Sequence, residues 1–261
     1  MTNTIESFED MSRPSIFWLS TEIGRAFTEY GLSLPFRTFS TKSETGDGHP
    51  VLVLPGFMAS DTSTKVLRKF IQNKGYTAVA WELGRNRGEV EILDLLFLKL
   101  EEMYEEYGRK ISIVGWSLGG VFARQLAKGK PHLVRQVITL GAPFRDIAAP
   151  NNASWIYNLI SGGKRVVDLN PDLLNDLPKP APVPTTAIYS KEDGVVSWEV
   201  CVEEKETAIH QNIQVRGSHI GLGVNAAVLK IIEDRLQYDA ENWVAFKPQT
   251  FVEDLFLYPS L

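Results

Sequence analysis

The stretch Ile111-Ser112-Ile113-Val114-Gly115-Trp116-Ser117-Leu118-Gly119-Gly120 decides how this chain folds. It joins a short apolar run, typical of a buried strand, to a helix-compatible run over 121–127. Gly-x-Ser-x-Gly at a strand-to-helix junction predicts a nucleophile elbow, a strained turn that lifts the serine hydroxyl above the sheet edge. Glycines are needed on both sides, because a Cβ atom there would collide with neighbouring atoms. We therefore predict that Ser117 is a nucleophile.

Working outward from this junction, apolar strand patterns alternate with helical patterns. Strands are expected at 51–54, 77–81, 111–114, 135–140, 186–189 and 212–215. Helices are expected at 14–30, after Asp61 with Ser63 or Thr64 as cap, at about 90–107, at 118–128 and at 224–237. Such alternation predicts an α/β fold with a mostly parallel sheet of about six strands, covered by helices on both faces. In these folds ligands bind beyond the carboxyl ends of the strands.

The first of these helices has apolar residues at near-helical spacing, and Gly31 offers a C-cap. We expect an amphipathic helix that packs on the body of the protein through these positions, with peripheral contact to a membrane as the alternative. The positions are Ile16, Leu19, Ile23, Phe27 and Tyr30.

The length of 261 residues suits one domain over 1–261. Within it, the proline-rich stretch at about 143–184 interrupts the alternation and predicts a small helical cap insertion. A net charge of −5 argues against nucleic acid as a partner. Cys201 is the single cysteine, which excludes an internal disulfide or a cysteine-built metal cluster.

Two features of the sequence bear on where in the cell the protein is expected: its first residues and the length of its apolar runs. The first ten residues are acidic and lack the pattern of a secretory signal, so a cytoplasmic location is expected. No apolar run reaches the roughly 18 to 20 residues that span a bilayer, so stable membrane insertion is not expected.

A serine nucleophile needs a general base, and histidine is the usual one. The chain has four histidines. His49 and His210 lie at the amino ends of predicted strands, and His132 lies in a turn. His219 alone follows the carboxyl end of a predicted strand, downstream of Ser117, and is the predicted base.

The base needs an acid that holds its tautomer. Asp193 follows the predicted strand at 186–189 and precedes a glycine that permits a sharp turn. We predict Asp193, with the adjacent Glu192 or an acid elsewhere as alternatives.

The oxyanion of an acyl-transfer reaction needs preorganised donors. The backbone N–H groups of Leu118, directly after the nucleophile, and of Phe57, in the loop after the first predicted core strand, are expected to supply them. Met58 is the nearest alternative donor in that loop. Arg85 and Asn86 either border the pocket or anchor loops through hydrogen bonds.

A set of apolar residues is expected to line the substrate pocket or, alternatively, only to stabilise the insertion. Such pockets are mainly hydrophobic. The residues with these two alternatives are Phe144, Trp155, Tyr157 and Leu159, and Met58 is expected to line the pocket as well.

Five motifs together resemble the α/β-hydrolase fold enzymes of the serine esterase and lipase kind, closest to bacterial cytosolic members. They lie at 54–61, 84–88, 115–120, 140–144 and 217–222, within a resemblance that covers roughly 50–235. Many lipases carry His-Gly at the oxyanion loop, where this chain has Pro55-Gly56.

The resemblance implies an α/β-hydrolase fold and a Ser-His-Asp triad that forms an acyl-enzyme, with no metal or cofactor. The expected substrate is a small-molecule ester with an apolar part. Acyltransferase, thioesterase or amidase activity on the same triad is the alternative. A further alternative is a ligand-binding protein with this fold that does not catalyse a reaction.

Overall fold

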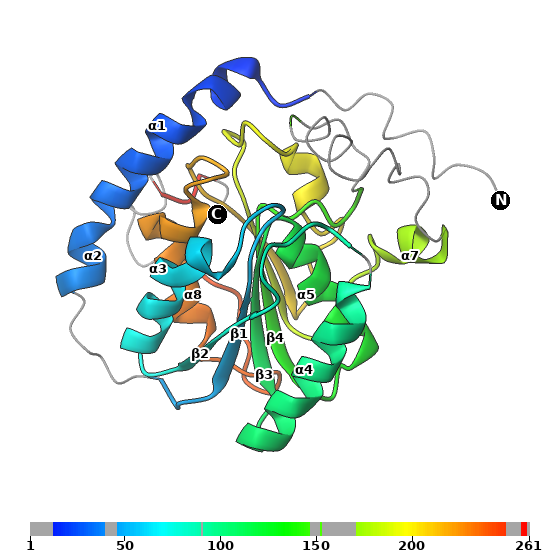
Figure 1. Ribbon diagram of the computed structural model, residues 1–261. Helices are drawn as coiled ribbons and strands as arrows, with labels where there is room; N and C mark the ends of the chain where they lie inside the picture. The colour runs from blue at the N-terminus through cyan, green and yellow to red at the C-terminus, as the bar shows by residue number, and fades with distance from the viewer. Residues whose placement is uncertain are drawn as a thin grey trace.

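Six parallel strands form the centre of the molecule (Figure 1), as the alternating sequence pattern predicts. The structure is a computed structural model that describes residues 13–39, 46–89, 91–146, 152, 171–248 and 257–259. The strand order is β2-β1-β3-β4-β5-β6, so β1 lies next to the edge strand β2, and the chain crosses over β1 once between β2 and β3. The strands are β1 (Pro50–Leu54), β2 (Thr77–Ala80), β3 (Ile111–Trp116), β4 (Val134–Leu140), β5 (Thr185–Tyr189) and β6 (His210–Gln214).

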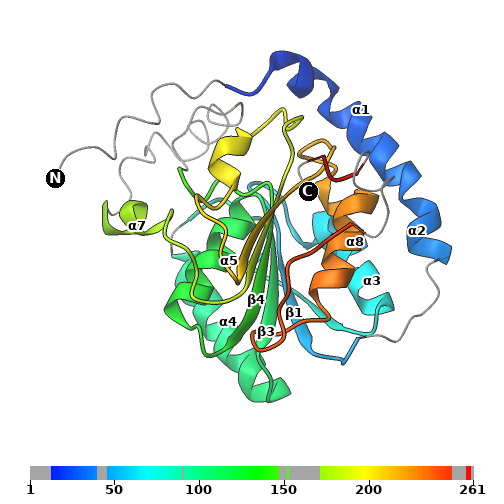
Figure 2. The ribbon, with the colours of Figure 1, turned by 180° about the vertical axis from the view of Figure 1, so that it is seen from behind.

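Helices cover both faces of the sheet, which explains why β1 is apolar along its whole length and fully buried. On one face lie α3 (Asp61–Asn73) and α8 (Ala226–Arg235), and on the other α4 (Ile92–Tyr107) and α5 (Leu118–Gly129), as Figure 2 shows from behind. Each pair contributes to its own apolar core, one including Leu67 and Leu229 and the other including Leu96 and Leu126.

Helix α3 begins earlier than predicted. Its N-cap is Ser60, not Ser63 or Thr64, and Asp61 is its first residue. The carboxylate of Asp61 accepts hydrogen bonds from the backbone N–H groups of Trp81 and Glu82, at 3.0 and 3.1 Å, just after β2. This contact with the neighbouring strand end holds the helix start at Asp61, and no local pattern in the sequence reveals it.

The N-terminal helix α1 (Ile16–Leu32) forms where predicted, but it continues past Gly31 to a C-cap at Ser33. It also does not pack through its apolar positions. Ile16 is 78% exposed, Ile23 66% and Phe27 74%. The residue that α1 buries is Glu22, which makes polar contacts with loops beyond the sheet. The expectation of an apolar contact face is therefore wrong, because the face turned to the body carries polar side chains.

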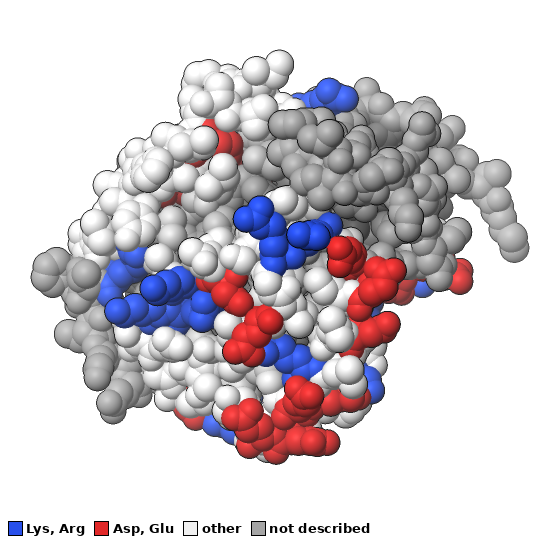
Figure 3. All heavy atoms as spheres, in the orientation of Figure 1, with Lys and Arg blue, Asp and Glu red and all other residues white. Residues whose placement is uncertain are grey.

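Figure 3 shows the outer surface from the side of Figure 1, where α1 is mostly free of charged side chains. Basic side chains gather over α3, whose sequence includes Lys65, Arg68 and Lys69. Acidic side chains gather along the lower end of α4. Among the described residues, no helix has both the length and the apolar character needed to cross a membrane.

Four short helices complete the described structure. They are α2 (Leu34–Phe39), α7 (Pro171–Asp176), η2 (Trp198–Cys201) and η3 (Leu222–Val224). Helix α7 belongs to the segment expected to form the cap, at about 143–184. Most of that segment, including Trp155 and Tyr157, lies outside the described residues.

Candidate active site

Ser117 occupies the sharp turn between β3 and α5, with a positive φ of 51°. A non-glycine residue rarely adopts such a φ, and it persists only where surrounding structure holds it. Its N–H donates to the carbonyl of Leu140 at the end of β4, at 2.8 Å. A Cβ atom on Gly119 would lie 2.5 Å from the carbonyl oxygen of Leu54, so α5 can approach β1 only with glycine there. The turn has the geometry that the sequence predicts for a nucleophile elbow.

Asp193 and His219 face each other across the loops that follow β5 and β6. Nδ1 of His219 lies 2.6 Å from Oδ2 of Asp193, and both side chains are buried. The other carboxylate oxygen, Oδ1, accepts the backbone N–H groups of Val195 and Val196, each at 2.8 Å. One oxygen therefore fixes the turn while the other orients the imidazole.

The alternative acid, Glu192, is directed elsewhere. Its carboxylate lies 3.8 Å from the guanidinium of Arg216, near the surface. Of the two adjacent acids, Asp193 is the one that contacts His219.

The pKa of His219 is raised above its ordinary value of 6.5. Burial by itself lowers the pKa of this imidazole, because it disfavours the charged form. The charge of Asp193, its hydrogen bond and the charge of Glu22 act in the opposite direction and outweigh burial. The surroundings of His219 therefore favour an imidazolium, the species that forms when a general base takes a proton.

Gly141 joins the serine turn to the Asp193–His219 pair. It follows Leu140, the acceptor of the Ser117 N–H, and its own N–H donates to Ile188 in β5 at 2.8 Å. A Cβ atom on Gly141 would lie 3.2 Å from Nδ1 of His219.

A second link between the serine turn and the histidine loop comes from Trp116, the residue before the serine. Its indole N–H donates to the carbonyl of His219 at 3.1 Å. These contacts connect the turn of Ser117 to the loop of His219 at the carboxyl ends of the strands.

The loop after β1 lies against the serine, and Asn86 anchors that loop. A Cβ atom on Gly56 would be 3.2 Å from Cβ of Ser117. Asn86 is buried. Its side-chain Nδ2 donates to the backbone carbonyl of Pro55 at 2.9 Å, and its backbone carbonyl accepts the N–H of Met58 at 2.6 Å. The Met58 N–H, the alternative oxyanion donor, is therefore engaged with Asn86. Of the two roles considered for Asn86, the structure supports loop anchoring.

The two predicted oxyanion donors lie on either side of Ser117. Leu118 is the first residue of α5, where backbone N–H groups have no acceptor within the helix and where the helix dipole favours negative charge. Phe57 follows Gly56 in the loop that contacts the serine. The backbone of both residues is thus placed next to the nucleophile turn.

Phe144 does not line an open pocket. It is 0% exposed, and its ring packs against the guanidinium of Arg124, 3.8 Å from the ring centroid, and within a small apolar cluster that includes Leu177. A ring with no accessible surface does not line an open pocket. Of the two roles considered for Phe144, its contact with Leu177 supports the second, which is to stabilise the insertion. Met58 is partly exposed beside the site, and Trp155, Tyr157 and Leu159 lie outside the described residues.

A second serine–histidine–aspartate arrangement exists at the opposite edge of the sheet. Nδ1 of His49 lies 2.6 Å from Oδ1 of Asp47, and Nε2 lies 2.8 Å from Oγ of Ser112. Both His49 and Ser112 are 0% exposed, and Ser112 lies within β3. No substrate can reach this serine, so the arrangement is structural. It agrees with the choice of His219 over His49.

Among the described residues, no three or more histidine, cysteine, aspartate or glutamate side chains are grouped so that they could hold a metal ion.

The fold of this chain is similar to those of several solved structures. Lipase B of Aspergillus fumigatus superposes with a TM-score of 0.58 and 16% sequence identity, over 75% of this chain and 54% of that one. An alpha/beta superfamily hydrolase of Oenococcus oeni gives a TM-score of 0.56 at 14% identity, over 74% and 94%. A thioesterase domain from the curacin biosynthetic pathway superposes with a TM-score of 0.51 and 13% sequence identity, over 74% of this chain and 92% of that one.

The chain therefore has the α/β-hydrolase fold, with the six-stranded parallel sheet and flanking helices described above. Its solved structural neighbours include lipases, esterases and other hydrolases. The aligned part spans about half of the Aspergillus lipase. No protein-family model matches the sequence, and no curated protein matches it either.

Proposed function

We propose that this protein is a serine hydrolase that cleaves carboxylic ester bonds through Ser117, His219 and Asp193. The observation that carries the proposal is the 2.6 Å contact between Nδ1 of His219 and Oδ2 of Asp193, next to a serine held at a φ of 51°. This combination supports an oriented base and a partly exposed serine at the edge of the sheet where this fold binds ligands.

In the proposed reaction, Nδ1–H of His219 donates to Asp193, which leaves Nε2 to accept the proton of the Ser117 hydroxyl. The serine oxygen attacks the ester carbonyl, and the N–H groups of Phe57 and Leu118 stabilise the oxyanion. His219 then returns the proton to the leaving alcohol, and an acyl-enzyme remains. Water, deprotonated by His219, attacks the acyl-enzyme and releases the carboxylic acid and Ser117.

The proposed substrate is a small ester with an apolar acyl or alcohol part. Met58 and Leu118, both partly exposed, are apolar side chains beside Ser117. An apolar site supplies binding energy but discriminates weakly, by only about 1 to 3 kcal/mol per methylene. We therefore expect graded activity across esters of different acyl length and not a sharp cut-off.

A fluorophosphonate probe tests the nucleophile directly, because it reacts with serine only where the base and the oxyanion donors are in place. We expect the intact protein to be labelled on the peptide that contains Ser117, as read by mass spectrometry, and Ser117→Ala to lose the label. Ser112→Ala is the matched control and should keep it. Absence of label from the folded wild-type protein would contradict the proposal.

The same triad also supports acyl transfer or thioester and amide cleavage. Product analysis with added alcohol or amine distinguishes these reactions, because an acceptor competing with water gives a new ester or amide. A folded protein that neither labels nor turns over any of these substrates would instead support a ligand-binding role.

A further inference from the structure

Helix α1 contacts the rest of the protein in an unusual way. A surface helix ordinarily buries an apolar stripe, whereas α1 buries Glu22, 2% exposed, and leaves Ile16, Phe17 and Phe27 largely exposed. Burying a carboxylate is unfavourable unless hydrogen bonds replace its water. The contacts of Glu22 therefore explain what attaches this helix.

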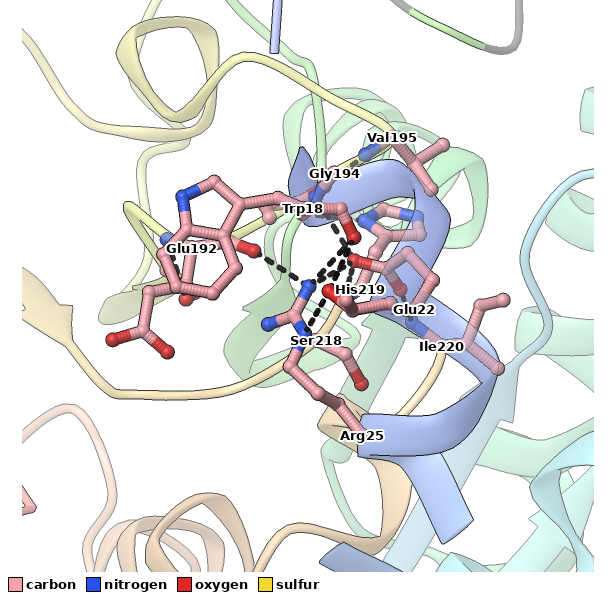
Figure 4. A network of polar contacts seen from close by, with 12 residues as sticks. Trp18, Glu22, Arg25, Glu192, Gly194, Val195, Ser218, His219 and Ile220 are labelled. Atoms are coloured by element: carbon pink, nitrogen blue, oxygen red, sulfur yellow. Dashed lines mark hydrogen bonds and ion pairs between the residues drawn. The ribbon is translucent and has the colours of Figure 1, made fainter. Parts of the chain in front are cut away.

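The carboxylate of Glu22 joins the two loops that carry Asp193 and His219 (Figure 4). Its Oε1 accepts the backbone N–H of Gly194 at 2.9 Å and that of His219 at 3.1 Å. Its Oε2 accepts the backbone N–H of Ile220 at 3.0 Å. One side chain thus holds the residue directly after the acid, the base itself and the residue directly after the base.

Arg25 completes this arrangement on the same face of α1. One of its guanidinium nitrogens, Nη2, lies 3.0 Å from Oε1 of Glu22 and donates to the carbonyl of Glu192 at 2.9 Å. The buried carboxylate is therefore compensated by three backbone N–H groups and one cation, which makes its burial tolerable.

The backbone of α1 also packs closely on the loop after β5. A Cβ atom on Gly194 would lie 2.4 Å from the nitrogen of Leu19. Seven residues beyond Glu22, Glu29 accepts the N–H of Ser218 at 2.8 Å and a side-chain N–H of Asn225 at 3.2 Å. The helix thus holds the histidine loop at two points on one face.

We propose that Glu22 is a positioning residue, which holds the loops of Asp193 and His219 in the relative placement that their hydrogen bond requires. The proposal rests on the function proposed above. The two loops follow separate strands, and within this network Glu22 is the side chain that accepts hydrogen bonds from both. The hydrogen bond from Ser190 Oγ to the carbonyl of Gly217, at 2.7 Å, joins the loops nearer their strands. Without Glu22 the segments beyond it, which carry the catalytic pair, can shift, and a shift of about 1 Å in a catalytic group can reduce rate by about 100-fold.

Glu22 also influences the protonation of His219. The charges that act on this imidazole are those of Asp193 and Glu22, and both raise its pKa. Arg25 contacts Glu22, and Glu29 contacts the backbone of Ser218, the residue before the imidazole. Replacing the carboxylate of Glu22 by a neutral amide should therefore lower the pKa of His219. This shift would show that the carboxylate acts on His219 itself, because a change in folding stability alone does not alter the pKa of the imidazole in the folded protein.

The test compares Glu22→Gln and Glu22→Ala with Glu105→Gln, which makes the same chemical change at an exposed position on α4. We expect Glu22→Ala to reduce kcat for a short ester and the fluorophosphonate labelling rate by about 10- to 100-fold, with KM changed much less. Glu22→Gln keeps an oxygen acceptor of similar shape, so it should retain more of the rate. In Glu22→Gln, the midpoint at which kcat/KM falls on the acid side of its pH profile should lie at lower pH than in the wild type. Glu105→Gln should match the wild type in all respects.

Two measurements do not depend on turnover. NMR titration of the His219 imidazole should give a lower pKa in Glu22→Gln than in the wild type. Hydrogen exchange at the backbone N–H groups of Gly194, His219 and Ile220 should be faster in Glu22→Ala than in the wild type.

The outcomes separate the two proposals. A wild-type protein that neither labels nor hydrolyses esters contradicts the proposed function, while the titration and exchange still decide whether Glu22 holds the pair. Normal labelling in the wild type, with unchanged kcat, unchanged His219 pKa and unchanged exchange in folded Glu22 variants, overturns the positioning role. If Glu22→Ala does not fold, the pH profile and titration of Glu22→Gln decide.

Discussion

A Cβ atom on Gly141 would lie 3.2 Å from Nδ1 of His219, on the side where the imidazole meets Asp193. Gly141 also has a positive φ of 54°. The residue is thus restricted in two ways: by its backbone conformation and by the ring beside it.

We expect Gly141→Ala to destabilise the fold by about 1 to 2 kcal/mol, because residue 141 has a positive φ. We also expect it to reduce the rate of fluorophosphonate labelling by at least about tenfold, because the imidazole of His219 must shift. Urea unfolding and labelling rate measure the two effects. Gly108→Ala is the matched control, since Gly108 has a φ of 61° and open space around it. It should lose stability and keep its labelling rate; equal labelling losses in both variants would contradict the contact with His219.

Asp193→Asn should reduce kcat by about 10³- to 10⁴-fold, as the equivalent change does in the serine-protease triad. The amide oxygen can still accept the N–H groups of Val195 and Val196, so the turn should persist. The amide nitrogen would then face Nδ1 of His219 and favour the wrong tautomer. Steady-state kinetics with a short ester measure the effect. Glu192→Gln, whose carboxylate lies near Arg216, should stay within about threefold of the wild type; a large loss there and none at 193 would reassign the acid.

Asn86→Ala should destabilise the protein by about 1 to 3 kcal/mol, because the buried carbonyl of Pro55 loses its side-chain donor. The rate should also fall, since the loop that carries Phe57 would be less well held. Urea unfolding and kcat provide the readouts. The neighbouring Arg85 is exposed, so Arg85→Ala should leave stability within about 0.5 kcal/mol of the wild type. An Asn86→Ala variant as stable and active as the wild type would refute the anchoring role.

The raised pKa of His219 determines the acid limb of the rate profile. A general base must be neutral in the free enzyme, so kcat/KM should rise with pH through a midpoint above 6.5. Ester hydrolysis measured between pH 5 and 9 locates the midpoint. A midpoint at or below 6.5 would show that the charges of Asp193 and Glu22 do not outweigh burial.

His49 should make the protein sensitive to acid. Burial lowers the pKa of His49 from 6.5 to about 4, with Arg135 and Arg109 acting in the same direction and Asp47 opposing them. Between pH 6.5 and 4 the unfolded chain binds more protons at this site, so the free energy of unfolding falls as the pH is lowered through this window. The full loss from His49 is on the order of 3 kcal/mol.

Urea unfolding at pH 7 and pH 4.5 checks this prediction. His49→Asn should show a smaller decrease between the two values than the wild type, whereas the exposed His132→Asn should behave like the wild type. His219 contributes with the opposite sign because its pKa is raised, so the comparison is between variants. Equal decreases in the wild type and His49→Asn would contradict the assignment.

Most of the secondary structure and the three candidate triad residues could be predicted because their signals are local. Apolar runs and helical spacing marked the strands and helices. Asp193 and His219 lie in the loops that follow strands, which placed them at the carboxyl edge of the sheet, since parallel strands all end at the same edge. The helix cap at Ser60 and the buried packing of Phe144 could not be predicted, because both depend on residues from other elements.

The sequence by itself determined the α/β class, the serine turn at 115–120 and the order of Ser117, Asp193 and His219, because each depends on neighbours along the chain. Only the tertiary structure decided which face of α1 turns inward, since Glu22 bonds to residues 172 to 198 positions away. It likewise distinguished Ser117, which is partly exposed, from Ser112, which is fully buried. Residue types and spacing do not record solvent access, which depends on how the elements pack.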